Sequence, residues 1–317
     1  MTGGVVTLGE TMALLAVPAS GLIREPVPVG LGGAESNVAI GLARLGVPVT
    51  WMSRLGDDAL GVFVRREIRA EGVTVLAATD PGAPTGLMLK EHRDGTPTRV
   101  RYYRAGSAAS RMTTADVSVA AIEAADVLHL TGITPALGPG PLDAMRHAIG
   151  VARATGTLVS LDVNHRRTLW ADADARAVLV SLLPSVDLLF AGVSEAAMLL
   201  DRPDELDSWA AGESLASALS PATVVIKLGA VGSLARTGSD VVRAAASPRV
   251  VVDPVGAGDA FVAGYLAALC AGASVSERLA TGNAAGGQVV TVPGDWEGLP
   301  YAHELLRPAG TPAEVVR

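Results

Sequence analysis

A single carboxylate, Asp259, stands directly behind Gly256, Ala257 and Gly258 in the stretch "VDPVGAGDAFVAG" at 252–264. Because only apolar and small residues follow it for several turns, the pattern predicts a buried helix with Asp259 in its first turn. Backbone N–H groups at such a helix start favour an anion, and a buried carboxylate is costly unless it is used or paired. The stretch therefore predicts either an anion site at the helix start or a helix-capping aspartate.

Elements that could position this stretch alternate along most of the chain. Short runs rich in Val, Leu and Ile predict buried strands, and the segments between them predict helices. We expect strands at 4–8, 127–132, 157–163, 186–192, 223–229 and, before the glycine turn, 248–253; we expect helices at 34–46, 141–156 and 213–220. Such alternation predicts the α/β class, with a mostly parallel central sheet flanked by helices on both faces.

One region breaks this alternation. Residues 85–104 alternate with a period of two around Asp94-Gly95, which predicts a β-hairpin. A hairpin inserted into a parallel α/β body suggests a small lid or interface sheet, and the extended stretch at about 12–30 can supply its partner strands. We expect one domain over 1–310 with these lid strands inserted, followed by a C-terminal tail at 311–317.

Bulk composition excludes several classes of protein. With 49% hydrophobic residues in 317, the chain has ample material for a core, so overall disorder is excluded. Only 3% aromatic residues and a net charge of −7 argue against a nucleic-acid partner. Cys270 is the single cysteine and cannot form an intrachain disulfide. The longest uncharged run, which follows Asp259, is too short to span a membrane, and the N-terminus does not read as a signal peptide. We expect a cytoplasmic protein without a membrane partner.

Two motifs at opposite ends of the chain carry a family resemblance. The stretch "DPVGAGDAFVAG" resembles the C-terminal signature of the PfkB, or ribokinase-like, sugar kinases. The companion N-terminal signature has its counterpart in "GGAESNVAIGLARLG" at 32–46, followed by "SRLGDDALG" at 53–61. The resemblance covers essentially the whole chain. It implies a ribokinase-like fold with a small β-sheet lid and a kinase that uses ATP and Mg²⁺.

The resemblance also implies roles for particular residues. Asp259 looks like the general base toward a sugar hydroxyl, and the N–H groups from Gly256 through Ala257 and Gly258 look like the anion hole for the γ-phosphoryl group. The Gly-Gly turn that ends at Gly33 would lie at the sugar site, and Asn37 on the following helix would bind the sugar.

The segment "VVIKLGAVGSL" at 224–234 is similar to the family's nucleotide-site strand and glycine turn. It would place Lys227, Gly229 and Gly232 near the ATP phosphates or ribose, although a strand and a tight turn explain each residue equally well. Asn283 would lie near the nucleotide base, or is a solvated or capping residue.

Glu195 falls where many relatives place a glutamate of an Asn-x-x-Glu motif that orders the water around magnesium. Gly192 stands here where that asparagine would be, so Glu195 either serves the metal indirectly or is a first-turn helix glutamate.

Four further segments are similar to 2-keto-3-deoxygluconate kinases within the family: 101–110, 128–137, 160–170 and 293–301. The substrate of those kinases is an anion, which arginine binds well through its planar fork of donors. By this resemblance the sugar site contains Gly33, Tyr102, Arg104, Ile133 and Arg166, and Asp295 binds sugar hydroxyls. For each arginine taken alone, a surface ion pair is the alternative. Met88 stands where some relatives carry a substrate-binding tyrosine and cannot donate that hydrogen bond.

The expected reaction is transfer of the ATP γ-phosphoryl group to the C6 hydroxyl of 2-keto-3-deoxygluconate. The alternatives are another PfkB kinase, acting on fructose, ribose or the galactonate-derived keto-deoxy acid, and a non-catalytic sugar or nucleotide sensor on the same fold. We also expect a homo-oligomer, because an exposed lid sheet often pairs with a copy of itself.

Overall fold

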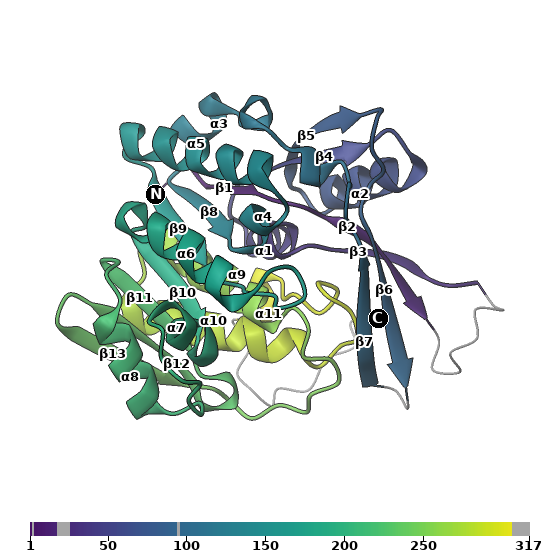
Figure 1. Ribbon diagram of the computed structural model, residues 1–317. Helices are drawn as coiled ribbons and strands as arrows, with labels where there is room; N and C mark the ends of the chain where they lie inside the picture. The colour runs from purple at the N-terminus through teal and green to yellow at the C-terminus, as the bar shows by residue number, and fades with distance from the viewer. Residues whose placement is uncertain (2, 18–25, 94–95, 306–317) are drawn as a thin grey trace.

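The computed structural model describes residues 1, 3–17, 26–93 and 96–305, of which 92–93 and 96–99 by their backbone only (Figure 1). A nine-stranded sheet forms its centre. From one edge to the other it contains β13 (Asp240–Ala245), β12 (Gly232–Thr237), β11 (Thr223–Lys227), β10 (Leu188–Gly192), β9 (Leu158–Asp162), β8 (Val127–Thr131), β1 (Val5–Leu8), β4 (Val49–Gly56) and β5 (Thr74–Asp80). All neighbours from β11 to β5 run parallel, while β12 and β13 are antiparallel.

Helices cover both faces of this sheet, as the alternation of the sequence predicts. One face packs against α1 (Ala34–Arg44), α2 (Ala59–Ala70), α9 (Ala257–Cys270) and α10 (Val275–Val289). The other packs against α3 (Val119–Glu123), α5 (Pro139–Thr155), α6 (Asp172–Leu182), α7 (Val193–Leu199) and α8 (Trp209–Ala218). Successive residues of a strand point to opposite faces. In β10, for example, Leu188 and Phe190 pack on the face covered by α1, α2, α9 and α10, whereas Leu189 and Ala191 pack on the opposite face.

A second sheet of four strands stands beside the main one, to its right in Figure 1. It is ordered β3 (Val29–Gly32), β2 (Met12–Val17), β6 (Leu87–Arg93) and β7 (Thr96–Tyr103). We call it the lid sheet. The predicted hairpin strands pair as β6 and β7, and β2 joins them in parallel to β6. The predicted turn at 94–95 lies outside the described residues, as do positions 306–317, so the domain span 1–310 and the tail 311–317 stay predictions.

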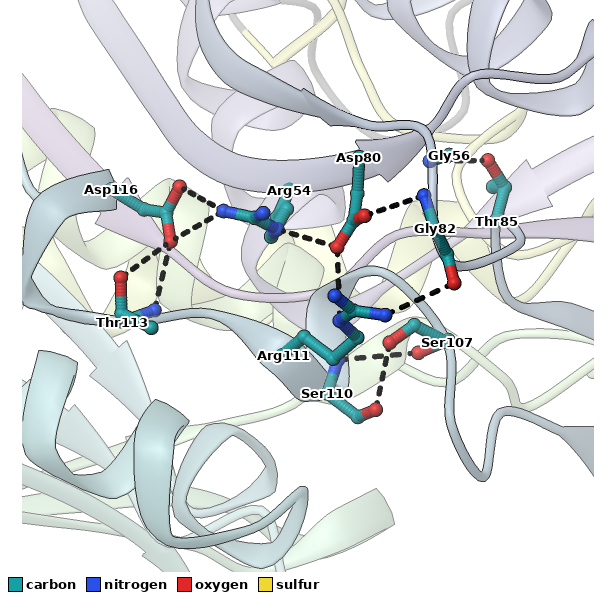
Figure 2. A network of polar contacts seen from close by, with 10 residues as sticks. All are labelled: Arg54, Gly56, Asp80, Gly82, Thr85, Ser107, Ser110, Arg111, Thr113 and Asp116. Atoms are coloured by element: carbon teal, nitrogen blue, oxygen red, sulfur yellow. Dashed lines mark hydrogen bonds and ion pairs between the residues drawn. The ribbon is translucent and has the colours of Figure 1, made fainter.

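One carboxylate, Asp80, connects the chain segments before β6 and after β7 to the main sheet (Figure 2). Its Oδ2 accepts a hydrogen bond from Nε of Arg54 at 2.9 Å and is 3.1 Å from Nε of Arg111, while its Oδ1 accepts from the Gly82 amide at 2.8 Å. Arg54 lies on β4, Gly82 precedes β6, and Arg111 follows β7. The lid sheet is therefore anchored at the carboxyl ends of β4 and β5.

The predicted strand at 248–253 is wrong. This segment has no ladder partner, and Val250 and Val251 are 82% and 60% exposed. The amides of Val252 and Asp253 donate instead to one carbonyl, that of Val290 at the end of α10. A run of valines is typical of a buried strand. Here, however, the chain has already left the edge strand β13 and passes over the end of α10, where no strand among the described residues lies beside it. Within the described part of the chain, no helix is both long and apolar enough to cross a bilayer.

Candidate active site

A cavity of about 420 Å³ lies between the inner face of the lid sheet and the carboxyl ends of the parallel strands. Ligands of open α/β sheets bind at this edge, because loops and helix starts from several strands meet there. Most of the residues that the sequence places in the site line this cavity: Gly33, Asn37, Tyr102, Arg104, Ile133, Arg166, Glu195, Lys227, Gly256, Ala257, Gly258, Asp259 and Asp295. The sequence thus predicts the composition of one site from segments more than 200 positions apart.

Asp259 is buried in the first turn of α9, at the cavity wall. Two side-chain amides hold its carboxylate: Nδ2 of Asn37 donates to Oδ2 at 2.9 Å, and Nδ2 of Asn164 donates to Oδ1 at 3.2 Å. Burial raises the pKa of Asp259 to about 6, against the lowering effects of the Asn37 hydrogen bond and the nearby Arg166 charge. Below neutral pH this carboxylate therefore changes between its proton-accepting and its protonated form.

The turn before Asp259 requires glycine at Gly256. This residue has φ of +79°, in the left-handed region, and a Cβ added there would lie 2.1 Å from the carbonyl oxygen of Asp295. The turn directs the chain so that the first amides of α9, which have no acceptor inside the helix, face the cavity. These donors and the positive end of the helix dipole favour an anion next to Asp259.

Lys227 ends β11 beside this anion site. Its Nζ lies 2.8 Å from both carboxylate oxygens of Asp162 and 3.5 Å from where a Cβ on Gly258 would be. Burial disfavours its charge, but Asp162 and, after it, Glu195 outweigh burial and raise the pKa of Lys227 above its usual value. Lys227 therefore stays a cation next to the start of α9, and it neutralises Asp162 at the end of β9.

Three predicted nucleotide residues lie away from the cavity lining. Gly229, with φ of +53°, and Gly232, with φ of +130°, shape the turn from β11 to β12. Asn283 on α10 bonds to Ser233 of β12 and donates to the carbonyl of Ala244 at 2.9 Å. The structure therefore groups these three around β12, next to the β13 edge of the main sheet and beyond Lys227.

The carboxylate of Glu195 is held by backbone donors. Oε1 accepts from the His165 amide at 2.8 Å and Oε2 from the Gly192 amide at 2.7 Å, so Glu195 closes the first turn of α7 while it also lines the cavity. No group of three or more metal-ligating acidic, His or Cys side chains exists among the described residues. Mg²⁺ commonly uses only one or two carboxylates together with water and substrate phosphates. The donors present fit a nucleotide-borne Mg²⁺, which Glu195 would hold through water.

On the lid side, Arg104 has a partner that the sequence argument did not include. Its Nε donates to Oε2 of Glu10 at 2.6 Å, and the hydroxyl of Ser107 donates to Oε1 of the same carboxylate at 2.6 Å. All three side chains are buried. The alternative of an ion pair therefore holds for Arg104, but the pair is buried in the site and does not lie on the surface.

Arg166 differs from Arg104, because it is exposed at the cavity and its described hydrogen bond goes to the carbonyl of His165 at 3.3 Å. Within the described contacts no carboxylate pairs with it. Arg166 is therefore the cation of the sugar side that is available to an anionic ligand.

The remaining wall is largely apolar. Tyr102 lines the cavity and Tyr103, on the opposite side of β7, is 57% exposed. Met88 packs with Met12 and Leu14 in the small core of the lid sheet. Gly33 begins α1, where a Cβ would lie 2.2 Å from the carbonyl oxygen of Glu10, so only glycine fits this close approach. Ile133 is buried at the start of α4 (Ile133–Ala136).

Sequence reasoning missed three polar residues of the site besides Glu10. These are Lys90, Asp162 and Asn164. Two signals were present: Lys90 is one of only two lysines in the chain, and Asp162 and Asn164 follow a strand within the segment 160–170. Asn164 adopts a positive φ of +39°, which places its amide under Asp259 and which asparagine tolerates better than most residues.

A buried carboxylate beside an amide-lined anion site, closed by a lid sheet at the carboxyl edge of a parallel sheet, defines an α/β phosphotransferase. Residues 4–301 match the family described as pfkB family carbohydrate kinase. The chain belongs to this family, and its fold is ribokinase-like, as predicted.

Individual relatives agree with this assignment over nearly their whole length. The chain is 38% identical to the 2-dehydro-3-deoxygluconokinase of Bacillus subtilis, over 95% of this chain and 93% of that protein. It is 35% identical to the 2-dehydro-3-deoxygalactonokinase of Haloferax volcanii, over 93% of each chain. The crystal structure of 2-dehydro-3-deoxygluconokinase from Thermotoga maritima superposes with a TM-score of 0.86 at 28% identity, covering 95% of this chain and 97% of that one.

Proposed function

We propose that this chain transfers the γ-phosphoryl group of ATP to the C6 hydroxyl of 2-keto-3-deoxygluconate, also named 2-dehydro-3-deoxygluconate. The observation that carries the proposal is Asp259, a buried carboxylate that two side-chain amides hold in the first turn of α9, directly after the backbone amides of Gly256, Ala257 and Gly258. Asp259 accepts the proton of the C6 hydroxyl, the C6 oxygen bonds to the γ-phosphorus, and the bond to the β-phosphate oxygen breaks to release ADP.

The first-turn amides of α9 stabilise the charge on the phosphoryl group during transfer. They are fixed before the substrate arrives, so no reorganisation is needed when the charge develops. Lys227 keeps the adjacent Asp162 neutralised, which prevents that carboxylate from repelling the phosphates. Mg²⁺ would neutralise the nucleotide phosphates, with Glu195 holding it through water.

We place the nucleotide on the side of Lys227 and the β11–β12 turn. Gly229 leaves the start of this turn without a side chain, so the ribose and phosphates can approach the backbone. At Gly232 the backbone of β13 fills that space, because a Cβ would lie 2.2 Å from the carbonyl oxygen of Ala244. Asn283 fixes α10 to β12 and β13 and borders the same side. We assign these three residues to the wall of the nucleotide site.

The sugar acid lies under the lid sheet, and its carboxylate binds Arg166. Arg104 contributes its remaining N–H donors, with its position fixed by Glu10. Tyr102, Ile133 and Gly33 shape the apolar side of the sugar site, and Asn37, which donates to Asp259, lines the same cavity.

A second candidate substrate is the galactonate-derived epimer of the same keto-deoxy acid. One relative at 35% identity is named as the kinase for that compound. Met88 leaves the site without the hydroxyl donor that tyrosine would supply there, so the lid offers one hydrogen bond fewer for choosing between epimers.

A substrate panel in a coupled ADP-release assay tests the proposal. We expect the gluconate-derived keto-deoxy acid to give a higher kcat/KM than the galactonate-derived acid, fructose or ribose. Faster turnover of a neutral sugar contradicts the assignment, and binding of ATP and sugar without any turnover would instead indicate a sensor.

The outer face of the lid sheet supports a homo-oligomer, since Val29 and Tyr103 are exposed there at 47% and 57%. We propose that two copies pair through this face in the cytoplasm, where ATP is abundant. Light scattering of Tyr103→Glu against the unchanged protein tests the pairing: the variant should be a monomer, and an unchanged mass contradicts the proposal.

A further inference from the structure

Lys90 connects the lid sheet to the core through two buried ion pairs. It lies on β6, and its Nζ is 2.6 Å from Oδ2 of Asp253 and 2.9 Å from Oδ1 of Asp295. The side chain of Lys90 is only 2% exposed, and both carboxylates are buried as well. Burial opposes its charge, but Asp295 and Asp253 outweigh burial and raise the pKa of Lys90 above its usual value. Lys90 therefore stays a cation in the closed arrangement.

The two carboxylates that Lys90 contacts set the turn before α9. Oδ1 of Asp253 accepts from the Val255 amide at 3.1 Å, and its Oδ2 accepts from the Gly294 amide at 3.2 Å as well as from Lys90. The backbone oxygen of Asp295 lies so close to Gly256 that no Cβ fits between them. One ammonium group thus touches both segments, 253–256 and 293–295, that give the anion site its shape.

We infer that Lys90 is a positioning residue, which sets the first-turn amides of α9 for the phosphoryl group only when the lid sheet is docked on the core. Docking inserts the ammonium between Asp253 and Asp295 and draws the two segments together. Without the lid sheet these carboxylates repel each other and the turn loosens. Closure over the sugar and completion of the anion site are then one event, so phosphoryl transfer to water is disfavoured while the site is open.

This inference rests on the proposed function only for its kinetic part, because the link between lid sheet and turn exists in the free protein. Its first test is therefore amide hydrogen exchange without substrate. Lys90→Met keeps the length of the side chain and removes its charge. Arg101→Met is the matched control: Arg101 lies on β7 of the same sheet, pairs with Glu91 and is half exposed, away from the cavity.

We expect Lys90→Met to accelerate exchange about tenfold or more in peptides of both β6 and residues 253–264, with exchange in β8 and β9 unchanged. Arg101→Met should leave residues 253–264 as in the unchanged protein. Exchange in 253–264 that stays the same in Lys90→Met overturns the inference, whichever sugar the enzyme uses.

The second test separates positioning from simple charge neutralisation. Lys90, Asp253 and Asp295 together carry a charge of −1. The double variant Lys90→Met/Asp253→Asn has the same total charge but lacks the ion pairs that join β6 to the turn. We expect its kcat to lie about 100-fold below that of Asp253→Asn alone, with the KM for ATP changed less than about threefold, and more ATP to be hydrolysed per sugar phosphorylated.

Equal kcat in the double variant and in Asp253→Asn shows that Lys90 only neutralises charge, and overturns the inference. If the unchanged protein phosphorylates neither keto-deoxy acid, the proposed function fails, while hydrogen exchange still decides the role of Lys90.

Discussion

Replacing Asp259 by asparagine should stabilise the protein and remove its turnover together. Burial raises the pKa of this carboxyl from a usual value of 3.8 to about 6. At neutral pH the folded state therefore holds an ionised carboxylate that is less favourable than the same group in the unfolded chain. The difference in pKa corresponds to about 3 kcal/mol. Asparagine removes this cost because it carries no charge.

The neighbouring amides allow the substitution without loss of a hydrogen bond. Asn164 donates to Asp259 through Nδ2, while its own Oδ1 is buried without a partner. If the Asn164 amide turns over, its oxygen accepts from the new side-chain NH₂, and the Asn37 hydrogen bond is retained. The stabilisation should then approach the full electrostatic value.

The raised pKa of Asp259 determines how the stability gained by Asp259→Asn changes with pH. A carboxyl with a raised pKa in the folded state supports stability below its unfolded pKa and loses that support as pH rises through about 6. Urea unfolding should therefore show Asp259→Asn more stable by about 1.5 kcal/mol near pH 5 and by about 3 kcal/mol near pH 8. Turnover should fall about 10²–10⁴-fold. A variant that is less stable at pH 8, or a difference that does not change with pH, refutes the reasoning.

Three further predictions concern the titration of Asp259 and the roles of Arg166 and Glu195. The kcat/KM of the unchanged enzyme should rise with pH to a plateau, with an apparent pKa of about 6; a pH–rate profile that is flat from pH 5 to 8 contradicts Asp259 as the titrating base. Arg166→Ala should raise the KM for the sugar acid about 10- to 100-fold with the KM for ATP unchanged, and Arg166→Lys should recover part of it; equal effects on both KM values in steady-state kinetics argue against a carboxylate contact. Glu195→Gln should raise the Mg²⁺ concentration that gives half-maximal rate, and an unchanged Mg²⁺ titration removes Glu195 from the metal site.

The sequence predicts the architecture well where local pattern and packing agree. Strands such as Leu188–Gly192 are apolar on both faces because helices cover both, and this makes them recognisable without tertiary information. The segment 248–253 has the same composition but no neighbouring strand. Strand pairing depends on partners distant in sequence, so composition alone cannot distinguish the two cases.

The site was predictable in its reacting group and less so in its charge balance. Asp259 and its glycine turn are adjacent in sequence, and the chemistry expected of them comes from the resemblance of this stretch to the family signature. The pairs Glu10–Arg104 and Lys90–Asp295 join segments that only the docked lid sheet brings together. A local reading therefore leaves Arg104 unpaired and assigns Asp295 to the sugar alone, although Lys90 already contacts it.

The position of the phosphate in the product tests the central claim most directly. With ATP, Mg²⁺ and 2-keto-3-deoxygluconate, the unchanged enzyme should form one phosphorylated product whose phosphorus couples to the protons on C6 in the NMR spectrum. Asp259→Asn, folded and at least as stable, should form almost none. Phosphate on another carbon, or product formation by the variant at the unchanged rate, contradicts the assignment of Asp259 as the base that activates the C6 hydroxyl.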